Sequence, residues 1–234
     1  MIDTAILLAA GAGTRLRSAA ESKPLCPVAG KPLIDHAIER MAAAGIARVI
    51  VVTGYRAEAI EAHLSARDWP ITVEIARSAD WRQPNGVSAL AAAPLLDGEA
   101  SLLAMCDHLV APALYARMAK AGAGDGLKLG IDRRLGHPWI DPEDVTCVAT
   151  ADDRIVAIGK GIEPHDCYDT GVFAVGGAFF DALMELEAPS ITEAVRVLTG
   201  EGRAGIVDCS DLDWIDVDDP RALAAAEAWL ARGD

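Results

Sequence analysis

The sequence predicts an α/β protein with a mixed, mostly parallel Rossmann-like sheet, helices on both faces of the sheet and a small antiparallel lobe. Two observations support this fold class. Buried apolar runs alternate with amphipathic helical patterns in the first half of the chain, and short β-like segments with Gly, Pro and Asp-Asp turns follow Gly122-Ala123-Gly124. The 234 residues contain no internal repeat and no flexible linker, so we expect a single domain, 1–234, with halves at 1–121 and 122–234.

The elements of the first half follow from apolar runs and helix signals. Residues 4–10 are expected to form a buried strand, and the next helix starts with Pro32 at its first position and ends at Gly45. Further strands are predicted at 48–53, 71–76 and 101–106, and further helices at 57–64, from near Gly86, and at 112–120.

The second half is predicted to begin with an antiparallel lobe. Its strands are expected at 127–132, 145–150, 155–158 and 171–175. Helices at 177–186 and 192–198, a strand near 214–217 and a C-terminal helix from Pro220 complete the chain. We expect these elements to extend the sheet of the first half.

Composition excludes several classes of partner. The 35 acidic and 21 basic residues give a net charge of −14, the wrong sign for holding nucleic acid or acidic lipid through bulk charge. Five cysteines without a CxxC pair indicate reduced thiols and a cytoplasmic location. No signal peptide and no direct membrane insertion are expected, because the N-terminus lacks a basic region and the apolar runs are short.

A small-residue turn, LAAGAGTRLR at 8–17, follows the first predicted strand. Its backbone N–H groups can approach an anion without interference from Cβ atoms. A dinucleotide fingerprint fails here because Leu16 takes the place of the third glycine, and a P-loop fails because Gly30-Lys31 is followed by Pro32.

The remaining pattern is GxGTR followed by Lys23, which suits a triphosphate. Arg15 and Lys23 could instead be ordinary surface charges on a tight turn. Their position favours binding, because the open end of the first parallel strand is where doubly wound sheets bind ligands. Asp107 follows the strand at 101–106, so its carboxylate is expected at the same sheet edge.

Eight segments carry a resemblance to nucleotidylyltransferases over the whole chain: LAAGAGTRLR, KPLCPVAGKPLIDHAIERMAAAGI, VIVVTGYRAEAIEAHL, PNGVSAL, MCDH, IGK, DTGVFAV and WIDVDDPRAL. Within this superfamily the chain most resembles the cytidylyltransferases that activate inositol 1-phosphate, which are often joined to a CDP-alcohol phosphatidyltransferase. The resemblance implies a nucleotidyltransferase-type sheet, with nucleotide bound by 1–121 and the acceptor by 122–234. It implies transfer of CMP from CTP to inositol 1-phosphate, which gives CDP-inositol and pyrophosphate.

The resemblance also implies the nucleotide site. The triphosphate would lie against the glycine turn, and Asn85-Gly86-Val87-Ser88 would lie against the base, where Gly86 admits a planar ring and Ser88 can hydrogen-bond its edge. A helix start with an Asn N-cap is the structural alternative for this segment. The nucleotide-binding residues implied are Leu8, Ala9, Ala10, Gly11, Gly13, Thr14, Arg15, Lys23, Asn85, Gly86 and Ser88.

In the family, the aspartate at the position of Asp107 binds Mg²⁺, and its partner should come from the C-terminal segment. If 214–218 is extended, Asp216 and Asp218 share one face, whereas Asp219 before Pro220 is expected to cap the last helix. We expect Asp216 as the second ligand and keep Asp218 as the alternative.

For the acceptor, the resemblance places Lys160 on the substrate phosphate and Asp169, with Thr170 and Gly171, at substrate hydroxyls. Trp139 could line the acceptor pocket. Arg15, Lys23 and Lys160 would then act with Mg²⁺ by neutralising charge, and no protein nucleophile is needed.

Two other functions stay open at this point. The acceptor could be another phosphorylated compound, such as a sugar 1-phosphate or phosphocholine, or the chain could be a non-catalytic nucleotide-binding regulator. The chain ends at Asp234 without a membrane domain, so a separate phosphatidyltransferase is expected to use any CDP-inositol. The oligomeric state stays open as well, with a homodimer as one alternative.

Overall fold

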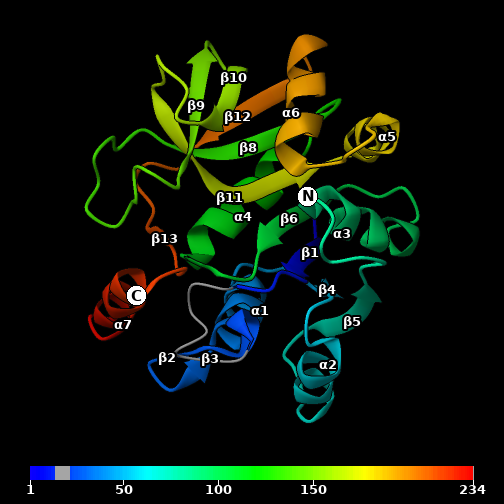
Figure 1. Ribbon diagram of the computed structural model, residues 1–234, viewed down its shortest axis with the longest axis vertical. Helices are drawn as coiled ribbons and strands as arrows, with labels where there is room; N and C mark the ends of the chain where they lie inside the picture. Colours follow the sequence, from blue (N-terminus) through cyan, green and yellow to red (C-terminus); the bar gives the residue numbers. More distant parts are fainter. Residues whose placement is uncertain (14–21, 234) are drawn as a thin grey trace.

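A nine-stranded mixed sheet runs through the computed structural model, which describes residues 1–13 and 22–233 (Figure 1). Its strand order is β5-β4-β1-β6-β11-β8-β12-β10-β9. The strands are β1 (Thr4–Ala9), β4 (Arg48–Thr53), β5 (Thr72–Arg77), β6 (Ser101–Met105), β8 (Leu127–Asp132), β9 (Thr146–Ala151), β10 (Arg154–Lys160), β11 (Cys167–Val175) and β12 (Ala204–Asp208).

The first four strands in this order form a parallel half. β1 pairs in parallel with β4 and β6, and β4 pairs in parallel with β5. All six residues of β1 are buried, because it is covered on both faces, as central parallel strands usually are. The predicted order of strands and helices in this half is confirmed, and most of the predicted ends lie within one or two residues of the observed ones.

The second half continues the same sheet rather than standing apart. β11 pairs antiparallel with β6 and β8, and β9 pairs antiparallel with both β10 and β11. Within the predicted antiparallel lobe, however, β8 and β12 pair in parallel. β12 was not predicted, because its AGIVD run is short, begins with small residues and is only partly buried. Of the nine strands, β10 and β11 run against the other seven.

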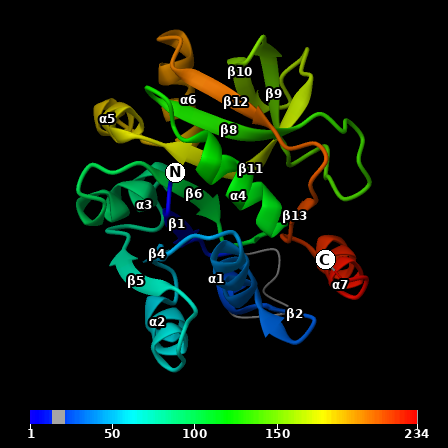
Figure 2. The same ribbon diagram turned by 180° about the vertical axis from the view of Figure 1, so that it is seen from behind.

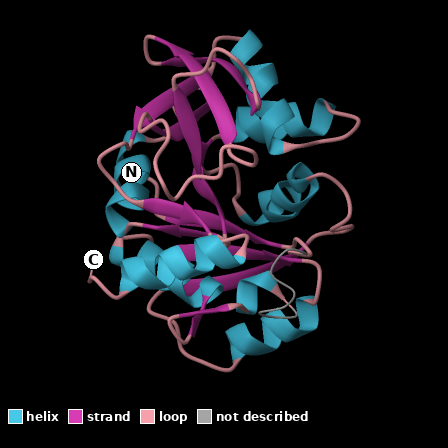
Figure 3. Cartoon of the chain, turned by 60° about the vertical axis from the view of Figure 1, so that its left-hand side comes forward, coloured by secondary structure: helices cyan, strands magenta, loops and turns pink. Residues whose placement is uncertain are grey.

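Helices cover both faces of the sheet, as predicted. On one face, α1 (Leu33–Ala43), α2 (Ala57–Ser65) and α4 (Pro112–Ala121) share an apolar cluster with Leu7 of β1. On the other face, α3 (Asn85–Ala92), α5 (Gly177–Glu185) and α6 (Ile191–Gly200) pack in a second cluster with Ile6. Figure 2 shows α1 and α4 in front of the sheet, and Figure 3 shows strands between helical layers.

Smaller elements surround the carboxyl end of β6. β7 (His108–Val110) and β13 (Trp214–Asp216) form a two-stranded antiparallel ribbon, and β2 (Pro27–Val28) pairs with β3 (Lys31–Pro32). α7 (Pro220–Leu230) packs against β2 and the ribbon in a third cluster. Two short 3-10 helices, η2 (Lys23–Leu25) and η3 (Ala93–Leu95), complete the fold. Pro32 belongs to β3 and caps α1, which therefore begins at Leu33 instead of at Pro32.

Within residues 1–13 and 22–233, no helix combines the length and the apolar character that crossing a membrane requires. The five cysteines are all buried as free thiols.

Candidate active site

The glycine turn leaves β1 at the carboxyl end of the parallel strands, as predicted. Gly13 has a φ of +53°, and a Cβ at this residue would lie 2.3 Å from Cβ of Lys23. Both observations require glycine at this position. Thr14 and Arg15, two predicted triphosphate ligands, lie outside the described residues.

Lys23 joins the two predicted metal ligands. Its ammonium lies 2.7 Å from Oδ2 of Asp107 and 3.6 Å from Oδ1 of Asp216, and its side chain is 11% exposed. Burial would lower the pKa of Lys23, but the two aspartates outweigh burial and raise it. Burial likewise opposes ionisation of Asp216, yet His108 and Lys23 lower the pKa of this carboxyl to about 2. The structure therefore holds the Lys23 ammonium between the carboxyl groups of Asp107 and Asp216.

His108 is the nearest neighbour of Asp216 on the paired strand. β7 and β13 pair with Asp216 opposite His108, and Nε2 of His108 lies 3.6 Å from Oδ2 of Asp216. The other ring nitrogen, Nδ1, lies 2.9 Å from the carbonyl oxygen of Thr170. Burial would lower the pKa of His108, but Asp216 above all raises it to about 9. The imidazole is thus held between a carbonyl and a carboxylate.

A cavity of about 200 Å³ opens beside this cluster. The loop between β8 and β9 forms one wall, and the other walls come from the ends of β6, β10, β11 and β13, from β7, and from the first turns of α3, α6 and α7. The polar residues that line it are Asn85, His108, Asp141, Asp144, Thr146, Lys160, Asp169, Thr192, Asp216, Asp218, Asp219 and Arg221, and Trp139 and Trp214 add aromatic surface.

Lys160 and Asp169 both face this cavity. The Lys160 ammonium is paired with the carboxylate of Asp144, and its side chain is 60% exposed. Oδ1 of Asp169 accepts a hydrogen bond of 2.7 Å from the backbone N–H of Gly171. Burial raises the pKa of Asp169 to about 6. Thr170 does not line the cavity, because its hydroxyl donates to the carbonyl oxygen of Gly130 at 2.8 Å.

The C-terminal aspartates divide into two roles. Asp219 caps α7, since its side chain accepts a hydrogen bond of 2.7 Å from the backbone N–H of Ala222; this confirms the predicted cap. One oxygen from each of Asp144, Asp216 and Asp218 lies within 4.8 Å of the others, and the same holds for ligand atoms of Asp107, His108 and Asp216. Asp216 is the member common to both groups.

The predicted base segment makes contacts within the protein. Asn85 is the first residue of α3, behind Pro84 as N-cap, and its Oδ1 accepts a hydrogen bond of 2.9 Å from the N–H of Ile191. A Cβ on Gly86 would meet the carbonyl oxygen of Pro189 at 2.6 Å, so close backbone packing already explains glycine there. Ser88 bonds Ser78 at 3.2 Å between hydroxyl oxygens. A contact with a base stays a prediction for this segment.

Sequence reasoning gave no role to three residues that shape the site: His108, Asp144 and Trp214. Trp214 had a usable signal, because it lies two residues before Asp216 on the same strand and shares its period-two face. His108 directly follows Asp107, which lies in the turn between β6 and β7, and adjacency at a turn alone predicts no shared contact. Asp144 lies in a loop without a pattern and had no signal.

The fold and the site define a nucleotidyltransferase: a glycine turn, a lysine and two aspartates meet where parallel strands end. The chain belongs to the family of MobA-like NTP transferase domains, whose model matches residues 5–179.

Three relatives illustrate what the chain is similar to. It is 32% identical over 98% of its length to a protein of Rubrobacter xylanophilus named bifunctional IPC transferase and DIPP synthase, and 28% identical over 99% to a protein of the same name from Aquifex aeolicus. The chain spans 53% of each of these proteins. The structure of the inositol-1-phosphate CTP transferase from T. maritima superposes with a TM-score of 0.86 at 24% identity, covering 99% of this chain and 97% of that one. This structural likeness shows the fold.

Proposed function

We propose that this protein is a Mg²⁺-dependent cytidylyltransferase that transfers CMP from CTP to inositol 1-phosphate. The observation that carries the proposal is the Lys23 ammonium between Asp107 and Asp216, beside a cavity that Lys160 and Asp169 line. The name of the T. maritima protein, inositol-1-phosphate CTP transferase, suggests the acceptor, and the two relatives named IPC transferase match almost the whole of this chain.

The nucleotide site is assigned to the end of β1. Leu8, Ala9 and Ala10 lead into the turn, where backbone N–H groups of Gly11 and Gly13 would contact the triphosphate. Lys23 and, from the sequence, Thr14 and Arg15 would add donors and positive charge. Asn85, Gly86 and Ser88 are assigned to the base.

The acceptor site is assigned to the cavity. Lys160 would bind the phosphate of inositol 1-phosphate once it leaves Asp144, and Asp169 would accept hydrogen bonds from ring hydroxyls. With a pKa of about 6, Asp169 is mostly ionised at pH 7 and acts as an acceptor. Gly171 would contribute as a lining residue of the cavity, and Thr170 would contribute indirectly, because its hydroxyl bonds Gly130 and its carbonyl oxygen lies at Nδ1 of His108.

The residues fit a hard divalent cation. Carboxylate oxygens are the ligands Mg²⁺ prefers, one or two protein carboxylates are usual, and a Lys23 ammonium already lies between Asp107 and Asp216. Asp107 and Asp216 would hold the ion, with Asp218 as the alternative to Asp216. When bound, Mg²⁺ supplies positive charge that neutralises phosphate oxygens during transfer.

In the proposed reaction, a phosphate oxygen of inositol 1-phosphate attacks the α-phosphorus of CTP. The bond from the α-phosphorus to the bridging oxygen breaks, and pyrophosphate leaves with that electron pair. The acceptor phosphate has a second pKa near ~6 and is largely dianionic at pH 7, so no general base is needed. The protein orients the two phosphates in line and neutralises charge through Lys23, Lys160 and Arg15.

Pyrophosphate release over a panel of nucleotides and acceptors tests the proposal. We expect turnover with CTP and inositol 1-phosphate, much less with UTP, and little with phosphocholine, which lacks the hydroxyls that Asp169 would bind. Efficient phosphocholine turnover that survives Asp169→Ala would refute the acceptor assignment. A preference for UTP or dTTP with glucose 1-phosphate would refute both assignments, and no turnover with any pair would favour a nucleotide-binding regulator. A CDP-alcohol phosphatidyltransferase would consume the proposed product.

A further inference from the structure

The strand that carries Asp216 lies outside the main sheet. β13 has three residues, and among the strands in residues 1–13 and 22–233 it pairs only with β7, in a ribbon of two strands. A ribbon this short has few backbone hydrogen bonds to fix it. The position of the Asp216 carboxylate therefore depends on contacts that tie β13 to the nine-stranded sheet.

Asp132, the last residue of β8, makes one such tie. It is fully buried, and its Oδ2 accepts a hydrogen bond of 2.8 Å from the indole Nε1–H of Trp214, the first residue of β13. Both carboxylate oxygens also accept from Arg134: Oδ1 from its backbone N–H at 2.8 Å and Oδ2 from Nη2 at 2.9 Å. Asp132 thus joins the end of a main-sheet strand to β13.

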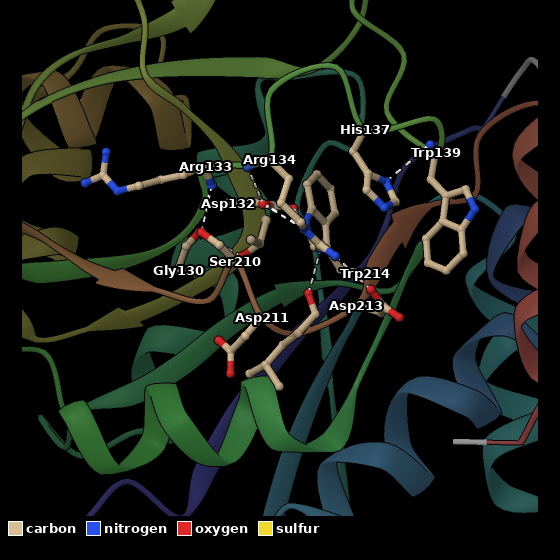
Figure 4. A network of polar contacts seen from close by, with 12 residues as sticks. Gly130, Asp132, Arg133, Arg134, His137, Trp139, Ser210, Asp211, Asp213 and Trp214 are labelled. Carbon is tan, nitrogen blue, oxygen red and sulfur yellow. Dashed lines mark hydrogen bonds and ion pairs between the residues drawn. The ribbon is translucent and has the colours of Figure 1, made fainter.

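Arg134 makes the second tie. Nη1 donates to Oδ1 of Asp213 at 2.9 Å, and Nη2 donates to the carbonyl oxygen of Leu212 at 2.8 Å. One guanidinium therefore bonds both Asp132 and the two residues that lead into β13. Figure 4 shows Arg134 between Asp132 and Asp213, while the neighbouring Arg133 extends away from this network.

Trp214 connects these ties to the reaction site. Its indole stacks on the imidazole of His108, with ring centroids 5.8 Å apart and planes 21° apart. The imidazole is also confined at Gly171, where a Cβ would lie 2.2 Å from Nδ1. With one face against Trp214 and Nδ1 at the Thr170 carbonyl, His108 directs Nε2 toward Asp216.

We propose that Asp132 and Arg134 are positioning residues for nucleotidyl transfer, which hold the Asp216 carboxylate in place through Trp214 and His108. This inference rests on the proposed function, in which Asp216 holds the metal. A buried ion pair adds little stability over apolar packing, so stability alone is a weak reason for burying Asp132. A hydrogen bond to the indole N–H, by contrast, fixes the rotation of the ring, and with it the imidazole plane.

Arg134→Gln and Arg133→Gln form a matched pair for the test. Both arginines make several hydrogen bonds and are partly exposed, at 28% and 36% of the side chain, but Arg133 bonds Asp166 and Thr150 instead of the ribbon. We expect Arg134→Gln to lower kcat about tenfold or more, with the CTP KM within about twofold. Arg134→Lys should restore part of kcat, and Arg133→Gln should leave kcat unchanged.

A second readout is independent of turnover and of the acceptor. Affinity for the Mn²⁺ complex of a non-hydrolysable CTP analogue, followed by electron paramagnetic resonance, should fall about tenfold in Arg134→Gln and not in Arg133→Gln. Trp214→Phe keeps a ring against His108 but loses the indole N–H. Its loss of affinity for the Mn²⁺ complex should therefore be smaller than that of Trp214→Leu. If Arg134→Gln does not fold, the comparison of Trp214→Phe with Trp214→Leu tests the inference instead.

Equal kcat and equal Mn²⁺ affinity in folded Arg133→Gln and Arg134→Gln would overturn the inference. The inference would also be overturned if both variants lost kcat and Mn²⁺ affinity in proportion to the decrease in their melting temperatures. If the wild-type protein binds the Mn²⁺ complex but does not use inositol 1-phosphate, the proposed acceptor fails, while the Mn²⁺ affinities of the variants still decide the positioning role.

Discussion

Replacing Lys23 by methionine should change stability in a way that depends on Mg²⁺. Methionine keeps the unbranched shape of the side chain and removes the ammonium that lies 2.7 Å from Asp107 and 3.6 Å from Asp216. The two carboxylates then face each other without a cation. We expect the variant to be less stable than the wild type without divalent cations, and to gain more stability from Mg²⁺.

The expected magnitude follows from the exposure of the three groups. A hydrogen bond to a charged group contributes about 1.5–3 kcal/mol. Asp107 and Asp216 are 29% and 38% exposed, so water replaces part of the lost pairing and we take about 2 kcal/mol. For a chain of this size that loss lowers Tm by roughly 4–8 °C. A ligand at 100 times its Kd adds about 2.7 kcal/mol, so saturating Mg²⁺ should offset the loss.

Thermal unfolding of the wild type and of Lys23→Met, with EDTA and with MgCl2, measures both effects. Lys31→Met is the matched control. Lys31 is another lysine in an ion pair, but its only partner among the described residues is Glu39, its side chain is 42% exposed, and it makes no ion pair with Asp107 or Asp216. Its Tm should change little and should not depend on Mg²⁺. If Lys23→Met were as stable as the wild type in EDTA, or if Mg²⁺ stabilised both proteins equally, the Lys23 ammonium would not be what stabilises the Asp107–Asp216 pair.

Three further predictions concern activity and pH. Asp107→Asn should abolish pyrophosphate release in a folded protein. Asp219→Asn keeps the acceptor of the helix cap, so its activity should stay near that of the wild type. Comparable losses of activity in the two variants would show that the metal ligands are wrongly assigned. Lys160→Ala should raise the acceptor KM or lower kcat, so kcat/KM for the acceptor should fall by about one to two decades. If steady-state kinetics showed a change in the CTP KM alone, Lys160 would not be the acceptor phosphate ligand. The pKa of Asp169 in the folded state is about 6, above the usual value for aspartate. Between pH 4 and 6 the carboxyl is therefore more fully ionised in the unfolded chain than in the folded protein. The free energy of unfolding of the wild type should decrease over this range as pH rises. Denaturant unfolding should therefore show Asp169→Asn gaining stability relative to wild type as pH rises from 4 to 6, and a constant difference would contradict the raised pKa.

The order of strands and helices in the parallel half could be predicted from local patterns of residues. β1 and β4 are apolar at consecutive positions, and because both faces of a central parallel strand are buried, the pattern has few other interpretations. The carboxyl ends of parallel strands share one edge, so the glycine turn after β1 and Asp107 after β6 were placed together without knowledge of side-chain contacts. The Asp219 cap was equally local, since it depends on its own helix start.

The contacts that complete the site depend on long-range packing and could not be predicted from local patterns. Lys23 meets Asp216 because β13 pairs with β7, and although an extended segment at β13 was predicted, its pairing with a distant strand was not. β12 was missed for a related reason, because it is held by its neighbours in the sheet and not by its own apolar content. The contacts of Trp214 with Asp132 and His108 depend on ring orientations fixed by packing. Such contacts are set by register and rotamer, which no local run of residues encodes.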